Sequence, residues 1–179
     1  MRSSSRGTSV RQSVVVVVND EHYEFEVEPR LLLSDFIRHE LHLTGTHVGC
    51  EHGICGACTI LLDDLPVRSC MILAVQVNEH SIRTVESLAD QSEYHPLQRA
   101  FHESHALQCG FCTPGLLMTL EPIVRAGMRL SDSEARVALS GNLCRCTGYQ
   151  QIIDALQLAL SESSCSVIEA PAPEKSNLS

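Results

Sequence analysis

The first 88 residues carry the short apolar runs and polar–apolar alternations that are typical of β-strands. Two of these runs flank Asn19-Asp20, a dipeptide typical of tight turns, which predicts a β-hairpin. Apolar residues recur at helical spacing from Leu32 to Leu41 and predict one helix packed on the sheet. The strands that we expect are 14–18, 22–27, 59–62, 67–73 and 81–85.

From residue 89 onward the spacing of the apolar residues becomes helical. Proline is favoured in the first turn of a helix, so Pro96 and Pro114 mark two expected helix starts. Ser131 and Glu134 have the spacing of a capping box, which marks a third start. The four expected helices are 96–107, 114–127, 131–140 and 149–160.

These two patterns divide the chain and place it in the α+β class. We expect a β-rich domain over residues 12–88 and a four-helix-bundle domain over residues 89–161. Residues 1–11 are rich in Ser and Arg and predict a flexible arm. Residues 162–179 are rich in Ser, Pro, Ala and Glu and predict a flexible tail.

The chain has 179 residues, of which 44% are hydrophobic, and this is enough to bury one core or two small ones. Its formal charge is -9, from 13 basic and 22 acidic residues, which argues against a nucleic-acid binder. No apolar run reaches the roughly 18 residues of a membrane helix, so no membrane insertion is expected. The N-terminal segment lacks the apolar core of a secretory signal, which favours a cytoplasmic location.

Nine cysteines remain to be explained, and the first four have the spacing of a plant-type [2Fe–2S] site. A redox dithiol would need only the Cys-x-x-Cys pair among them. A Rieske site would add His52, but the second Cys-His half is absent, so we expect His52 to be an exposed loop residue. Gly49, Gly53 and Gly56 leave room for backbone N–H groups to approach the sulfurs. The four cysteines are Cys50, Cys55, Cys58 and Cys70.

A second group of four cysteines follows in the helical region. Its spacing favours another iron–sulfur cluster and leaves a structural four-thiolate zinc site as the alternative. Helices are expected to begin directly after these cysteines, with Thr113 as one N-cap, so their positive ends should lower the pKa of the thiols. Antiparallel pairing of the helices would bring both cysteine loops to one end of the bundle. The group comprises Cys109, Cys112, Cys144 and Cys146.

The chain shows no sign of catalytic residues of its own. It has no G-x-G-x-x-G motif, no P-loop and no paired nucleophile and base. Substrate chemistry is therefore expected to take place elsewhere, with this chain carrying electrons. Cys165 lies in the expected tail and is predicted to be a free thiol rather than a ligand.

Three motifs together resemble the iron–sulfur subunit of molybdenum hydroxylases, the superfamily of xanthine dehydrogenase, carbon monoxide dehydrogenase and aldehyde oxidoreductase. The resemblance extends over roughly residues 12 to 161. It implies a β-grasp, ferredoxin-like domain around the first cysteine group and a helical domain around the second, each with one [2Fe–2S] cluster. The motifs are GCEHGICGACT (49–59), QCGFCTPG (108–115) and NLCRCTGY (142–149).

The resemblance also implies an electron path and partners. Electrons would pass from a molybdopterin centre, in its cytosine dinucleotide form, through the helical-domain cluster and the ferredoxin-domain cluster to FAD. Gln108 would contact the pterin, and Cys146 would be the cluster ligand nearest to it, where electrons enter. Molybdenum with its pterin would belong to a large subunit and FAD to a medium subunit, in a dimer of heterotrimers.

Two alternatives are a free-standing two-cluster ferredoxin and a structural zinc-binding interaction protein. The first would be purified without partners, and the second would contain zinc in place of iron and sulfide. The substrate of a complex stays open at this point among purines, N-heteroaromatics, aldehydes and carbon monoxide.

Overall fold

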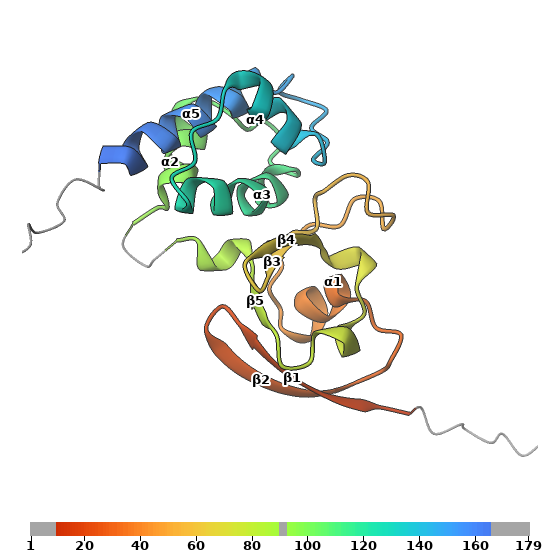
Figure 1. The fold of residues 1–179 in the computed structure, drawn as a ribbon. Coiled ribbons are helices and arrows are strands. Elements are labelled where there is room, and N and C mark those ends of the chain that lie inside the picture. Colours follow the sequence, from red (N-terminus) through yellow and green to blue (C-terminus); the bar gives the residue numbers. More distant parts are fainter. Residues whose placement is uncertain (1–9, 90–92, 166–179) are drawn as a thin grey trace, which may run out of the picture.

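The computed structural model describes residues 10–89 and 93–165, and its first half is a five-stranded mixed sheet (Figure 1). The strand order is β2-β1-β5-β3-β4, with β1 parallel to β5 and all other neighbours antiparallel. The last strand in sequence therefore lies at the centre of the sheet. The strands are β1 (Gln12–Val18), β2 (Glu21–Val27), β3 (Thr59–Leu62), β4 (Leu65–Arg68) and β5 (Ser81–Arg83).

The predicted hairpin is confirmed in β1 and β2, which pair along their whole length. Asn19 and Asp20 in its turn have φ values of 50° and 67°, in the left-handed region that a type I′ turn requires. Val14, Val16 and Val18 alternate along β1 and are each 1% exposed, so one face of the hairpin belongs to the core.

Three other elements of the first half differ from the prediction. The strand expected over 81–85 ends at Arg83, and Val85 begins a 3₁₀ turn. The helix expected from Leu32 to Leu41 consists of α1 (Leu33–Asp35) and a wider π-helical segment, Phe36–Glu40. The strand expected over 67–73 is wrong beyond Arg68, because Ser69–Met71 forms a 3₁₀ turn. A short apolar run marks burial without separating a strand from a buried turn. Cys70 lies within this turn and is thereby directed into the protein.

The second half contains four helices whose apolar faces share one core. The capping box predicted at Ser131 and Glu134 is confirmed. The last helix continues past Leu160 to Cys165, so the first residues of the predicted tail are helical, and 166–179 lie outside the described residues. With α1, the described residues contain five α-helices, and none is long and apolar enough to cross a bilayer. The four are α2 (Pro96–Glu103), α3 (Thr113–Arg125), α4 (Asp132–Leu139) and α5 (Gln150–Cys165).

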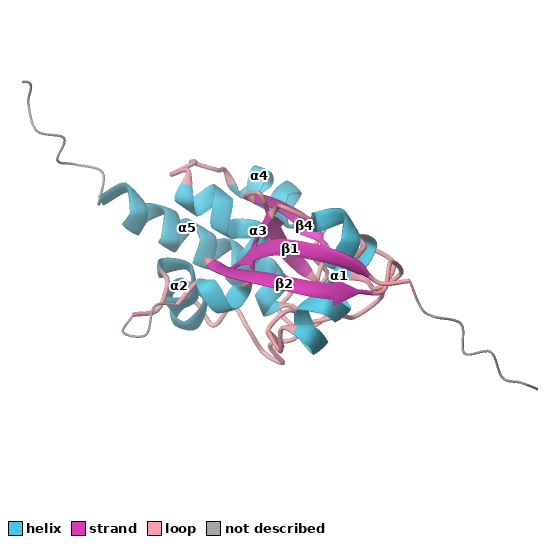
Figure 2. Cartoon of the chain, turned by 90° about the horizontal axis from the view of Figure 1, so that it is seen from below, coloured by secondary structure: helices cyan, strands magenta, loops and turns pink. Residues whose placement is uncertain are grey.

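The two halves meet where α3 lies beside β3 (Figures 1 and 2). Leu61 of β3 is fully buried and belongs to the core of the helices.

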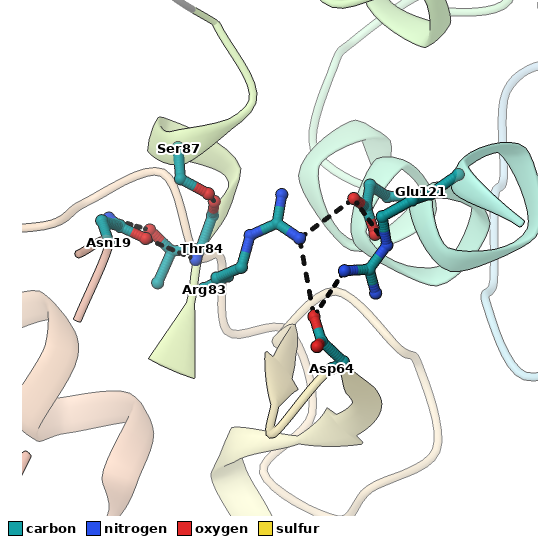
Figure 3. Close-up of polar contacts among 7 residues, drawn as sticks. Asn19, Asp64, Arg83, Thr84, Ser87 and Glu121 are labelled. Carbon is teal, nitrogen blue, oxygen red and sulfur yellow. Dashed lines mark hydrogen bonds and ion pairs between the residues drawn. The ribbon is translucent and has the colours of Figure 1, made fainter. Parts of the chain in front are cut away.

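Four charged side chains form ion pairs at the same junction between the halves (Figure 3). Arg83 Nη1 lies 3.0 Å from Glu121 Oε1, and Arg125 Nη1 lies 2.7 Å from Asp64 Oδ1. Arg83 also lies 3.7 Å from Asp64, and Arg125 lies 3.5 Å from Glu121. Each half therefore contributes one acid and one base to an alternating arrangement, which we call the charged ring.

Candidate iron–sulfur sites

The first cysteine group lies where the loop before β3 meets the turn after β4. Cys50, Cys55 and Cys58 belong to the loop, and Cys70 belongs to the turn. The structure brings them together: the Cys55 N–H donates to Cys50 Sγ at 3.4 Å, and Cys70 interacts with the thiols of Cys58 and Cys50. Cys58 and Cys70 are 2% and 4% exposed, so one side of the group is closed to water.

The thiols of this group differ in acidity. Hydrogen bonds from the backbone N–H groups of Cys55 and His52 lower the pKa of Cys50 to about 6. Burial, together with the neighbouring Cys58 thiol, raises the pKa of Cys70 to about 11. Cys50 is therefore a thiolate at neutral pH, whereas Cys70 would lose its proton when a metal centre binds.

Glycines give the loop the close fit that a cluster site needs. A Cβ on Gly49 would lie 3.2 Å from Cys55 Sγ, and one on Gly53 would lie 2.9 Å from Met71 Cγ. Gly53 also has a φ of 73°, which disfavours other residues. His52 is exposed, as predicted, and its ring nitrogen contacts the carbonyl oxygen of Cys50. Thiols lined by backbone N–H groups fit a [2Fe–2S] cluster.

The second group lies where the loop between α2 and α3 meets the loop between α4 and α5. The Sγ atoms of Cys109 and Cys146 are 3.6 Å apart, and the thiols of Cys112 and Cys144 also interact. Each contact joins one cysteine of one loop to one cysteine of the other. Cys109 and Cys146 are exposed, whereas Cys112 and Cys144 are partly buried. The group therefore has one open side and one covered side.

The prediction that helix N-termini lower the pKa of these thiols is wrong for Cys146, where the contact with the Cys109 thiol raises the pKa, and it is wrong for Cys112. Burial raises its pKa to about 12, and the Cys144 thiol acts in the same direction. Burial alone would also raise the pKa of Cys144, but hydrogen bonds from Thr147 hold that pKa below its ordinary value. The predicted N-cap is also wrong, because Cys112 occupies that position and the buried Thr113 hydroxyl has no hydrogen-bond partner.

The thiol donors alone fit more than one kind of centre. Four cysteines per group suit a [2Fe–2S] cluster, and they also suit structural zinc. In the described part of the chain, no three His, Cys, Asp or Glu side chains stand at the spacing of a site for one metal ion. Gln108 is exposed beside Cys109. Cys165 ends α5, and its side chain lies outside the described part.

Two hydrogen bonds join the cysteine groups to each other, and the sequence did not predict them. The Leu143 N–H donates to the Cys55 carbonyl at 2.9 Å, and Asn142 Nδ2 donates to the Gly56 carbonyl at 3.1 Å. Asn142 and Leu143 immediately precede Cys144. Their place inside a cysteine motif was the only feature of the sequence that marked these two residues as functional. It did not indicate which loop they would contact.

Comparisons with known proteins separate the possible centres. A family model of the 2Fe-2S iron-sulfur cluster binding domain matches residues 16–89, and one of the [2Fe-2S] binding domain matches residues 84–157. The caffeine dehydrogenase subunit gamma of Pseudomonas sp. (strain CBB1) is 59% identical over 147 residues, which cover 80% of this chain and 88% of that protein. The nicotine 6-hydroxylase small subunit of Paenarthrobacter nicotinovorans is 51% identical over 148 residues, covering 83% and 89%.

A solved structure agrees with these relatives. The crystal structure of quinoline 2-oxidoreductase from Pseudomonas putida 86 matches with a TM-score of 0.83 at 46% identity, over 88% of this chain and 98% of the matched chain. The chain belongs to the iron–sulfur subunits of the molybdenum hydroxylase family. It is thus a subunit of an oxidoreductase complex with a role in electron transfer, as the motifs predicted. The family also favours two iron–sulfur domains over a zinc protein.

Proposed function

We propose that this chain relays electrons from a molybdopterin centre on one partner, through two [2Fe–2S] clusters, to FAD on another. Each cluster, when bound, takes up and passes on single electrons. The ligands of the first cluster would be Cys50, Cys55, Cys58 and Cys70. The ligands of the second cluster would be Cys109, Cys112, Cys144 and Cys146.

One observation carries this proposal: the two cysteine groups lie on adjoining loops. The hydrogen bond from the Leu143 N–H to the Cys55 carbonyl, 2.9 Å long, connects a neighbour of Cys144 directly to a cysteine of the other group. A chain with two unrelated structural metal sites would not require them to adjoin. Close placement does serve the transfer of electrons from one group to the other.

The exposure of the residues supports the proposed direction of the relay. Cys146 and Gln108 are both exposed, so both are accessible to a partner. We assign Gln108 to contact with the pterin and Cys146 to the entry of electrons. In the first group Cys58 and Cys70 are buried, which excludes water from that side, while Cys50 is partly exposed. We assign this open side to the accepting partner.

The finer architecture and the partners belong to the same proposal. Residues 12–88 would form a β-grasp domain and residues 89–161 a four-helix bundle. A large subunit would carry molybdenum with molybdopterin cytosine dinucleotide, and a medium subunit would carry FAD, in a cytoplasmic dimer of heterotrimers. The names "subunit gamma" and "small subunit" of the two relatives support an assembly of several chains.

For the complex as a whole we propose an N-heteroaromatic substrate. Relatives at 46–59% identity are named for caffeine, nicotine and quinoline, which are all N-heterocycles. Aldehyde oxidoreductase and aldehyde oxidase match at 34–37% identity. Oxidation of a panel of purines, pyridines, quinolines and aldehydes by the purified complex tests this proposal, and a preference for aldehydes would contradict it.

The relay is tested with two cysteine variants of the purified complex. The wild-type chain should bind about four iron atoms and give two distinct EPR signals on reduction. In Cys58→Ser, substrate should still reduce the second cluster, while stopped-flow absorbance shows slow reduction of FAD. In Cys146→Ser, reduction of both the remaining cluster and FAD should be slow. Undiminished FAD reduction in Cys58→Ser would remove the first cluster from the main path, and a single EPR signal in the wild type would refute the second site.

A further inference from the structure

Asn142 is a buried amide, 1% exposed, that lies between the two cysteine groups. Its Nδ2 donates to the carbonyl oxygen of Gly56 at 3.1 Å. Its Oδ1 accepts from the Thr119 hydroxyl at 3.0 Å, and this hydroxyl shares its proton with the Gly115 carbonyl oxygen at 2.8 Å. Gly56 follows Cys55 in the first cysteine loop, and Thr119 belongs to α3. One side chain is therefore bonded at the same time to the first loop and to the helix that begins beside Cys112.

The backbone of Asn142 is also hydrogen-bonded, to residues of the second cysteine loop and its neighbours. Its carbonyl accepts from the Tyr149 hydroxyl at 3.0 Å, and that hydroxyl oxygen accepts from the Cys144 N–H at 2.9 Å. Its N–H donates to the Leu139 carbonyl at the end of α4. Because these groups are all partnered in a buried site, the amide is held in one orientation.

The two loops approach each other closely around this amide. A Cβ on Gly56 would lie 2.7 Å from Asn142 Nδ2 and 2.4 Å from the Gly141 carbonyl oxygen. Arg68, the last residue of β4, donates to that same Gly141 carbonyl at 2.6 Å. The loops are thus in direct contact at Asn142, and its hydrogen bond to Gly56 holds them together beside the bond from the Leu143 N–H to the Cys55 carbonyl.

We propose that Asn142 is a positioning residue that fixes the separation and relative orientation of the two clusters. The inference rests on the proposed relay. The donor of the amide faces the first loop and its acceptor faces α3, an arrangement that only an amide of this length provides. An aspartate would turn an oxygen toward the Gly56 carbonyl, so repulsion and a lost hydrogen bond would push the loops apart.

The test compares Asn142→Asp and Asn142→Leu with the wild type in the purified complex. Both variants should keep the wild-type iron content, and the g-values of both EPR signals should stay those of the wild type. With both clusters reduced, the magnetic dipolar splitting of the EPR signals should be smaller than in the wild type. The splitting falls with the cube of the distance between the spins, and this distance increases when the loops move apart. Electron transfer from the second cluster to the first should be slower in stopped-flow measurements.

Asn19→Asp is the matched control. Asn19 is also hydrogen-bonded at both ends of its amide, to the Thr84 hydroxyl at 2.9 Å and the Thr84 N–H at 2.8 Å, but it lies at the β1–β2 turn (Figure 3). This variant should keep the wild-type splitting and transfer rate.

Unchanged splitting and transfer rate in both Asn142 variants would overturn the proposal. Loss of iron from both would overturn it as well, since Asn142 would then be needed for cluster binding rather than for spacing. Fewer than two signals in the wild type would instead refute the relay itself, before any variant is compared.

Discussion

Gly115 lies in the first turn of α3, directly against the loop of the first cysteine group. A Cβ on Gly115 would lie 2.2 Å from the Gly56 carbonyl oxygen and 3.0 Å from Ala57 Cα. Ordinary contacts of such an atom begin at 3.4 Å. Gly115→Ala therefore forces the helix and the loop apart by about 1 Å at this point, since backbone cannot rotate away as a side chain can.

Two opposing effects decide the size of the change. In open space, replacing a helical glycine with alanine would stabilise the protein by about 0.5–1 kcal/mol. Overpacking costs about 1–3 kcal/mol. We expect a net loss of about 1–2 kcal/mol, which lowers the midpoint of thermal unfolding by roughly 2–8 °C. Because Gly56 adjoins Cys55, the visible circular dichroism of the first cluster should change as well.

Gly127→Ala is the control for this substitution. Nothing lies within 4 Å of a Cβ at Gly127, but its φ is 61°, so the cost there is backbone strain of about 1–2 kcal/mol. Both variants should unfold earlier than the wild type when the loaded complex is heated. Only Gly115→Ala should alter the dichroism of the cluster at low temperature. A stabilised Gly115→Ala variant would show that the close approach of α3 to the loop is absent.

Two further predictions concern the junction of the halves. Burial, with Arg83 and Arg99 nearby and Glu121 opposing them, lowers the pKa of His95. The stability that this shift contributes is complete above the unfolded pKa of about 6.5 and is lost as the pH falls toward the lower folded pKa. His95→Asn removes the titrating imidazole but keeps an acceptor for the Leu97 N–H. The free energy of unfolding in urea should therefore change less between about pH 7.5 and about pH 5.5 than in the wild type, and an unchanged pH dependence would contradict this. Glu121→Gln removes the buried charge of the charged ring. Both arginines reach solvent, so the loss should be about 1–3 kcal/mol, below the roughly 3–5 kcal/mol of a fully buried pair. Glu162→Gln removes only the exposed pair with Arg99 and should cost about 0–1 kcal/mol, and equal urea midpoints for the two variants would refute the difference.

Local signals carried most of the sequence prediction. The Asn19-Asp20 turn and the Ser131 capping box each depend on residues a few positions apart, and the structure contains both. The closely spaced cysteines, such as Cys55 and Cys58, are local signals of the same kind. The strand predicted over 67–73 ends at Arg68, because the residues that follow form the 3₁₀ turn that buries Cys70.

Contacts between distant segments could not be predicted in the same way. Asn142 bonds to Gly56, 86 positions away, and Arg83 pairs with Glu121, 38 positions away. No periodicity in the sequence encodes such partners. The acidity of Cys112 was also mispredicted, because the depth of its burial depends on how the helices pack.

The position of Leu61 limits how this protein can be taken apart. Leu61 is a strand residue buried in the core of the helices, and Glu121 is a helix residue whose buried charge is paired with Arg83 of the sheet. A cut between the halves would expose Leu61 to water and would take Arg83 away from Glu121, leaving Glu121 only the longer contact with Arg125. The halves are therefore not interchangeable modules, and a one-cluster form of this subunit has to be made by replacing cysteines rather than by dividing the chain.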